Sequence, residues 1–177
     1  ALVEASQYGV SQFRQRAIYV GVRRDTSLTY QWPLPKFELP RSVGCLLYDL
    51  MAEGGWENVD DWRDNANKIA PTIVGGSKKH GGPDLGPTRA RQAWARLGVN
   101  GAGIADGPPE KSFLSLPKLT NRMVARVQGF PDDWNFFGGK TTVHRQIGNA
   151  FPPPVAEAIA MQIRTTITPK VAVARVC

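Results

Sequence analysis

The sequence has few cysteines, no long apolar run and fewer acidic than basic side chains. Cys45 and Cys177 form neither a disulfide framework nor a metal-ligand spacing, which favours a reducing compartment. No run approaches the ~18 apolar residues of a membrane span, and no charged-then-apolar signal segment opens the chain. We therefore expect a cytoplasmic protein, and these absences exclude a disulfide-rich secreted domain and a membrane-spanning helix.

What the sequence does contain points to loops and to an anionic partner. Its 177 residues suffice for one domain, or for one domain with pieces of another, and 18 Gly and 14 Pro predict many loops. The net charge of +7 favours nucleic acid as the first partner to consider, although charge alone does not decide this. Because the chain begins Ala1-Leu2-Val3, as if inside an element, we expect a fragment or a processed piece.

The N-terminal segment combines long polar donors with an apolar run. Ala17–Val22 is rich in β-formers and predicts a buried strand of a larger sheet. Just before it, Gln12, Arg14 and Arg16 alternate, so in an extended segment they would project from one face. Three long donors on one face suit a grip on an anion or an amide. A solvated strand edge is the alternative.

The middle of the chain predicts short elements separated by loops. An apolar set from Val43 to Met51 predicts a helix capped by Ser42 and closed by Gly54-Gly55. Thr120 is a fair cap for another helix, which Gly129 and Pro131 would end. Further elements are expected as a short helix within 56–68, a strand at 71–74 and a helix capped by Thr88 that ends at Gly98.

Two glycine-rich loops flank the helix expected after Thr88. The first, residues 75–87, carries Lys78, Lys79 and His80, and the second covers residues 101–109. The spacing of a phosphate-binding loop, Gly-x4-Gly-Lys-Ser/Thr, is absent, which argues against mononucleotide binding. A grip on DNA backbone or base edges is the better functional interpretation, and a solvated loop is the alternative.

The stretch from Arg145 to Ala156 predicts a tight backbone element that opens into a helix. Gly148 and Asn149 are residue types that accept positive φ, and Pro153 and Pro154 suit a helix start. A Gly-Asn loop at a helix N-terminus would leave N–H groups free for a ligand. A turn followed by a surface helix is the plainer alternative.

Three of these segments, in this order, resemble the C-terminal sequence blocks of DNA (cytosine-5) methyltransferases. Tyr8-Gly-Val-Ser-Gln-Phe-Arg-Gln-Arg16 resembles the family's Gly-Val-Pro-Gln-x-Arg-x-Arg block. Leu119–Trp134 resembles its Arg-x-x-Arg-x-Gln-Gly-Phe-Pro-Asp block, and Arg145–Ala156 its Gln-x-Gly-Asn-Ala-x-Pro-Pro-x-Val-Ala block. Ser11 stands where the family usually has Pro, and Met123 where a Glu often completes a capping box, so we expect one bond fewer there.

The resemblance implies an α/β protein overall. It would combine an α+β target-recognition domain of short strands, short helices and long loops with terminal pieces of a Rossmann-like catalytic domain. The implied boundaries are residues 1–24 for the end of the catalytic domain, 25–140 for the recognition domain, 141–167 for a segment and helix returning to the catalytic domain, and 168–177 for a tail.

The family's nucleophile is missing from this chain. The Pro-Cys-Gln block, the Glu-Asn-Val block and the Phe-x-Gly-x-Gly loop that binds S-adenosyl-L-methionine normally precede the segment that matches Tyr8–Arg16. Neither Cys45 nor Cys177 lies in Pro-Cys-Gln, and Glu57-Asn58-Val59 lies in the variable region, where we interpret it as coincidence. The chain is therefore not expected to be active alone.

The resemblance also implies site residues and partners. Arg16 would hold the oxygen of a flipped cytosine, with Arg14 and Gln12 placed nearby to grip the base or the adjacent phosphate. Asn149 and Ala150 would border S-adenosyl-L-methionine, shared with the missing N-terminal half on the same polypeptide or a separate subunit. Double-stranded DNA would be the substrate, in a prokaryotic, nucleoid-associated restriction-modification setting. The alternatives are a non-catalytic DNA-binding module and a basic domain with no DNA role. The candidate DNA contacts are Lys78, Lys79, His80, Arg89 and Arg91.

Overall fold

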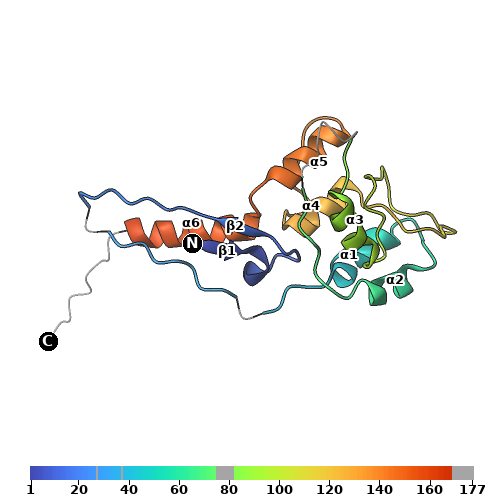
Figure 1. Ribbon diagram of the computed structural model, residues 1–177, viewed down its shortest axis with the longest axis horizontal. Coiled ribbons are helices and arrows are strands. Elements are labelled where there is room, and N and C mark those ends of the chain that lie inside the picture. Colours follow the sequence, from blue (N-terminus) through green and yellow to red (C-terminus); the bar gives the residue numbers. More distant parts are fainter. Residues whose placement is uncertain (27, 37, 75–81, 169–177) are drawn as a thin grey trace.

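The structure, a computed structural model, describes residues 1–26, 28–36, 38–74 and 82–168 and shows an elongated smaller lobe beside a rounder, larger one (Figure 1). The smaller lobe holds β1, β2 and α6, and the larger lobe holds α1 to α5. In chain order the elements are β1 (Leu2–Glu4), a 3-10 turn (Ala5–Tyr8), β2 (Gln15–Ala17), α1 (Val43–Ala52), α2 (Val59–Asn65), α3 (Thr88–Ala95), α4 (Asn121–Gln128), α5 (Lys140–Asn149) and α6 (Pro153–Ile167).

The larger lobe is built around α1, which packs on α2 and on α4, while α4 packs on α5. The expected cap of α1 is confirmed, since the Ser42 hydroxyl accepts a hydrogen bond from the Cys45 N–H over 3.3 Å. The apolar face of α1 is fully buried in a core that also contains Trp62 of α2 and Trp94 of α3. This face consists of Val43, Leu47, Leu50 and Met51.

The smaller lobe has its own apolar cluster. β1 pairs antiparallel with β2, with Leu2 opposite Ala17. Val3 and Tyr8 pack against Val155 and Ile159 of α6, so the C-terminal helix covers the N-terminal segment. The Tyr8 hydroxyl also donates to the Pro33 carbonyl over 3.0 Å.

Both strands expected from the sequence are wrong in position. β2 ends at Ala17 and is exposed, and residues 18–22 form no strand. Beyond Ala17, the Ile18 backbone still exchanges two hydrogen bonds with Ala1, whereas residues 19–22 form no backbone hydrogen bond with the described residues. At 71–74 the Ile73 N–H is taken by the side chain of Gln12 instead of by a neighbouring strand.

The helix expected from Thr120 is confirmed, whereas two details of capping are corrected. Thr120 caps α4, and Gly129 follows with φ +91°. The bond thought lost at Met123 is made by its sulfur, which accepts the Thr120 N–H over 3.4 Å. At α3 the cap position belongs to Pro87, and Thr88 is already the first helical residue.

The Gly-Asn loop expected at a helix start is also wrong. Gly148 and Asn149 are the last residues of α5, and neither has positive φ. Pro152 is the cap residue of α6 and Pro153 its first residue, which confirms the proline-initiated helix. The N–H of Ala150 is already used by the Gln146 and Ile147 carbonyls, over 3.1 and 3.2 Å.

The described residues combine several helices with one small sheet and long irregular connections, which is compatible with the α/β class. No helix among them combines the length and the apolar character needed to cross a membrane.

Candidate functional site

Gln12 lies at the centre of a buried network that connects distant parts of the chain. Its side-chain Nε2 donates to Gln128 Oε1 over 2.6 Å, and its Oε1 accepts the Ile73 N–H over 2.7 Å. Gln128, the last residue of α4, donates in turn to the Ala150 carbonyl over 2.9 Å. Both glutamine side chains are fully buried. These bonds, with those of Arg14, are called the buried polar network below.

Arg14 extends the same network with a charge. Its side chain is buried, with Nη1 donating to the Ile73 carbonyl over 2.7 Å. Nη2 donates to the carbonyls of Gly148 and Ala150, over 2.9 and 3.2 Å. Burial, with a smaller effect of Arg16, lowers the pKa of Arg14 to about 10, so the guanidinium is charged at neutral pH. The carbonyls at the C-terminal end of α5 stabilise that charge.

The expectation that Gln12, Arg14 and Arg16 project from one face of an extended segment is wrong. Gln12 and Arg14 point inward, while Arg16 is exposed on β2. The segment is not a regular strand before β2, since the Gln12 N–H turns back to the Val10 carbonyl over 2.7 Å. The donors of Gln12 therefore bind protein groups, and so do both terminal nitrogens of Arg14.

Arg16 remains available to an external ligand. Its Nη1 donates to the Gln15 carbonyl over 2.7 Å, and within the part of the chain that the structure describes it forms no ion pair. Permanent charge and several unused donors make it suited to an anionic or carbonyl oxygen.

At the C-terminal end of α5, two side chains are exposed and one carbonyl is already bound within the protein. Asn149 is exposed and so is Phe151, whereas the Ala150 carbonyl is occupied by Arg14 and Gln128. Asn149 and Phe151 can therefore contact a bound molecule by side chain, and Ala150 serves as an anchor of the buried polar network.

Lys78, Lys79 and His80 lie outside the described residues. Ile73, before this stretch, and Asp84, after it, are each held by buried side chains. Ile73 is bound by the buried polar network. Asp84 is held through its carbonyl, which lies 2.9 Å from Nε2 of the fully buried His144. Burial lowers the pKa of His144 below its usual value, so the ring is neutral at pH 7.

The two arginines of α3 differ in environment. Arg89 is exposed, which leaves its guanidinium accessible to an external ligand. Arg91 donates through Nε to the Gly86 carbonyl over 2.8 Å and pairs through Nη2 with Asp84 over 3.2 Å. These bonds hold the turn at 84–86, so Arg91 stabilises the fold locally. From the sequence alone, Arg91 is only a candidate DNA contact.

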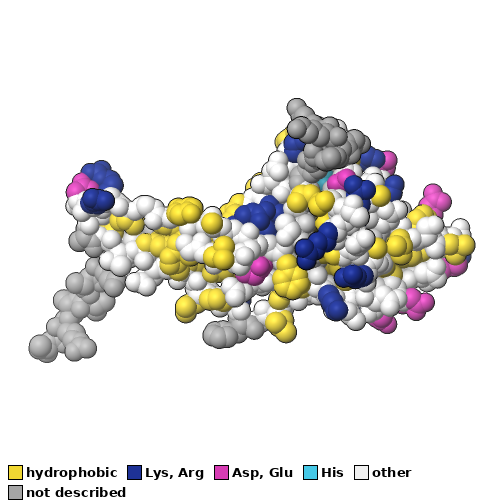
Figure 2. All heavy atoms as spheres, in the orientation of Figure 1, with side chains coloured by type: hydrophobic (Ala, Val, Ile, Leu, Met, Phe, Trp, Pro, Cys, Tyr) yellow, Lys and Arg dark blue, Asp and Glu magenta, His cyan; other side chains and the backbone are white. Residues whose placement is uncertain are grey.

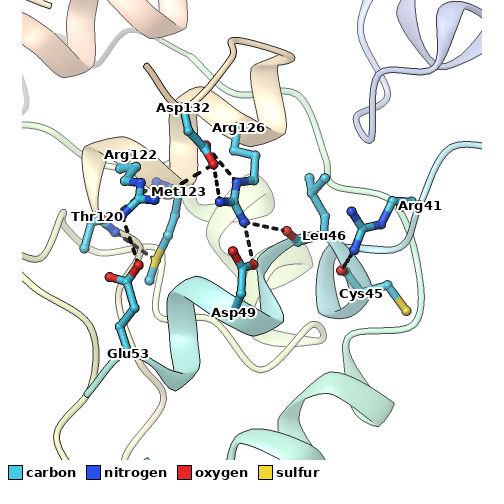
Figure 3. A network of polar contacts seen from close by, with 10 residues as sticks. All are labelled: Arg41, Cys45, Leu46, Asp49, Glu53, Thr120, Arg122, Met123, Arg126 and Asp132. Carbon is cyan, nitrogen blue, oxygen red and sulfur yellow. Dashed lines mark hydrogen bonds and ion pairs between the residues drawn. The ribbon is translucent and has the colours of Figure 1, made fainter. Parts of the chain in front are cut away.

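A second polar cluster joins α1 to α4 (Figure 3). Arg126 of α4 donates to the Leu46 carbonyl over 3.1 Å and pairs with Asp49 and Asp132. Arg122 pairs with Glu53 at the end of α1 over 3.0 Å. The hydrogen bonds to Arg126 lower the pKa of Asp49 and of Asp132. The cluster fixes the turn after α4 against α1.

Sequence reasoning did not assign roles to Gln128, His144 or Arg126. Gln128 lies in the segment Arg126-Val-Gln-Gly-Phe-Pro-Asp132, whose polar residues could have been considered buried contacts. No spacing signal distinguishes His144. Within the described ranges, no group of three His, Cys, Asp or Glu side chains could hold a metal ion.

Comparisons with known proteins agree on one family. Residues 1–165 match the family model of C-5 cytosine-specific DNA methylases. The chain is 54% identical over 169 residues to the type II methyltransferase M.NaeI of Lentzea aerocolonigenes, covering 94% of this chain and 41% of that protein. It is 47% identical over 165 residues to M.NgoMIV of Neisseria gonorrhoeae, covering 92% of this chain and 52% of that protein. The chain thus spans about half the length of these relatives. It belongs to the C-5 cytosine-specific DNA methylase family.

Proposed function

We propose that this chain is the C-terminal part of a DNA (cytosine-5) methyltransferase, which recognises DNA and completes the methylation site. The observation that carries the proposal is the convergence of the three resembling segments on the buried polar network. Gln12 and Arg14 come from the first segment, Gln128 from the second, and Gly148 and Ala150 from the third. Residues so distant in sequence meet at one place, with exposed Arg16 two positions beyond Arg14.

Arg16 is the group that we propose contacts the target base. When the ring of a flipped cytosine is attacked, negative charge develops on its oxygen. A fixed cation at that oxygen lowers the barrier, and a guanidinium supplies it with a planar set of donors. The exposed position of Arg16 allows this contact.

Gln12, Arg14 and Gln128 act, in this proposal, as positioning residues. Their side-chain bonds fix the segment that precedes β2, so the Arg16 side chain extends from a defined place. Preorganised groups cost no rearrangement when the charge develops. This replaces the direct contact with cytosine or phosphate expected for Gln12 and Arg14 from the resemblance.

S-adenosyl-L-methionine, which supplies the methyl group when bound, would contact this chain only at the end of α5. The exposed Asn149 offers a carboxamide and the neighbouring Phe151, 40% exposed, offers an aromatic face. Ala150 between them is anchored through its carbonyl to Arg14 and Gln128. The rest of the cofactor site would come from the N-terminal half.

Double-stranded DNA is the proposed substrate. Arg89 is exposed on α3 next to the turn held by Arg91, and Lys78, Lys79 and His80 are proposed to contact DNA with it. Figure 2 shows several Lys and Arg side chains in the middle of the view, whereas several acidic side chains lie at the far end of the larger lobe. A basic region of this kind attracts a polyanion.

The N-terminal catalytic half is the proposed protein partner, on the same polypeptide or a separate subunit. The smaller lobe exposes large apolar side chains that a soluble protein rarely leaves uncovered, and Figure 2 shows such side chains along this lobe. We propose that residues 1–24 and 141–167 pack on the N-terminal catalytic half. Residues 25–140 would form the recognition domain and residues 168–177 the tail. The exposed residues include Tyr19, Leu34, Met161 and Ile167.

The experiment is reconstitution. The chain is mixed with a polypeptide carrying the Pro-Cys-Gln, Glu-Asn-Val and Phe-x-Gly-x-Gly blocks, and transfer of labelled methyl groups to DNA is measured. The mixture should methylate cytosine and neither component should do so alone. Methylation by this chain alone, or no methylation by a mixture that forms a stable complex, would contradict the proposal.

A further inference from the structure

A groove outside the site described above lies between the connection at residues 65–71 and the C-terminal part of α3. Its volume is about 420 Å³, in the range of small-ligand sites. It opens beside Phe13, the residue between Gln12 and Arg14. The lining residues that matter here are Phe13, Asn65, Asn67, Lys68, Arg96 and Leu97.

The polar side of the groove consists of donors without acid partners. Lys68 and Arg96 are exposed, and within the described residues their side chains form no hydrogen bond or ion pair. Asn65 and Asn67 add two carboxamides, and the lining contains no Asp or Glu. Two cations facing one concave space without counter-charges favour an anion there.

The apolar side of the groove is held in place by the backbone. Phe13 leaves 57% of its surface exposed, although its N–H donates to the Ala70 carbonyl over 2.8 Å and its carbonyl accepts the Thr72 hydroxyl over 2.5 Å. Leu97 is nearly buried beneath the groove. An exposed ring on a fixed backbone provides a face for a sugar or a base at small entropic cost.

The cationic side is also preformed. The Lys68 carbonyl accepts the Val43 N–H over 2.9 Å, and the Ala66 carbonyl accepts the Gly44 N–H over 2.8 Å. These bonds fix the connection to the start of α1, so the Lys68 side chain extends from a rigid base. Arg96 follows directly after α3, whose Trp94 is fully buried.

We propose that this groove binds a sugar–phosphate unit of duplex DNA outside the target base pair. Lys68 and Arg96 bind the phosphate oxygens, and the sugar packs on Phe13 and Leu97. The proposal rests on the DNA-binding function proposed above and adds a second contact region on the same segment that displays Arg16. The contact is independent of base sequence, because phosphate and sugar are the same at every position.

The test measures DNA affinity against salt by fluorescence anisotropy with a duplex of about 30 base pairs, a length chosen to exceed a typical footprint. Each form of the chain is measured after mixing with the N-terminal catalytic half. The variant is Lys68→Ala combined with Arg96→Ala. Its matched control, Arg24→Ala combined with Arg164→Ala, removes the same charge from two exposed positions on the smaller lobe. Near-ultraviolet circular dichroism of the five tryptophans checks that both fold as the unaltered chain does.

The groove variant should reduce the salt slope of log affinity by about 1 and the affinity at 0.1 M salt by about tenfold, because the contact with one phosphate is lost. The control should change the slope by less than half as much. An unchanged slope in the groove variant, with normal binding by the unaltered chain, would overturn the groove but not the proposed function. No binding by the unaltered chain would overturn both. Deoxycytidine monophosphate is a second probe. If the unaltered chain binds it and the groove variant does not, while both bind DNA equally well, DNA is not the occupant of the groove.

Discussion

The side chains of Gln12 and Gln128 hydrogen-bond over 2.6 Å although 116 positions separate them in the chain. Each also holds a backbone group, the Ile73 N–H for Gln12 and the Ala150 carbonyl for Gln128. Because the pair is buried, replacing one amide leaves partners without water or protein to satisfy them. The pair therefore connects the segment before Arg16 to the ends of α4 and α5.

Gln12→Leu should lower the free energy of unfolding by about 1–3 kcal/mol, since it leaves the Ile73 N–H and the Gln128 carboxamide oxygen unpaired. Urea unfolding followed by tryptophan fluorescence measures this. Gln7→Leu is the control, because Gln7 is exposed. A Gln12 variant as stable as the control would show that the amide pair contributes little.

Gly44→Ala should be strongly destabilising, because α1 and α2 approach closely at this residue. A Cβ built at Gly44 would lie 2.1 Å from the Arg63 carbonyl oxygen, so the two helices would have to separate. We expect a loss of about 2 kcal/mol or more, the cost of a forced backbone shift. Gly107→Ala, where no atom lies within 4 Å of the added carbon, should have a small effect. Equal effects in thermal unfolding would contradict the close packing.

His144 should make the fold sensitive to mild acid. Burial lowers its pKa in the folded protein, whereas the unfolded ring titrates near the usual 6.5. Between these values the unfolded chain binds more protons, so the free energy of unfolding falls as the pH drops below about 6.5. His144→Gln should flatten the loss of melting temperature between pH 7.5 and 5.5, and His80→Gln, which changes the other histidine, serves as the comparison. If the melting temperature of the His144→Gln variant still falls as much between pH 7.5 and 5.5, groups other than His144 cause the acid sensitivity.

Arg126→Ala should weaken the contact between α1 and α4. The substitution removes a mostly buried guanidinium that binds Asp49, Asp132 and the Leu46 carbonyl. The carboxylates are largely exposed, so we expect only about 1–2 kcal/mol, measured by urea unfolding. The pKa of each carboxyl is lowered in the folded protein, so the ion pairs stabilise above about pH 4 and lose this effect as the pH falls through the folded values. A pH profile identical to that of the unaltered chain would contradict the pairing.

The sequence predicted elements whose signals are local. The caps at Ser42 and Thr120, the stop at Gly129 and the proline start of α6 depend on neighbours within a turn, and each is found where expected. The strands were misplaced because a strand requires a partner that the local pattern does not specify. Gly148 and Asn149 were misplaced because residue types that permit positive φ do not require it.

The sequence predicted candidate site residues but not which of them face outward, and their roles stay predictions. The exposure of Arg16, Asn149 and Arg89 agrees with a ligand-contacting role. The inward turn of Gln12 and Arg14 could not be predicted, because it depends on hydrogen-bond partners more than 50 positions away along the chain. Met123 completes its cap with sulfur, which residue statistics do not anticipate.

The most direct test of the central claim is the methylation rate of the reconstituted enzyme with Arg16→Ala. Because Arg16 is exposed, its loss should leave the stability of the chain unchanged. The turnover number should fall by about 100-fold, the usual cost of removing one group that stabilises developing charge. Arg24→Ala, at another exposed arginine, should keep the original rate. An Arg16→Ala enzyme that methylates cytosine at the unaltered rate would contradict the account.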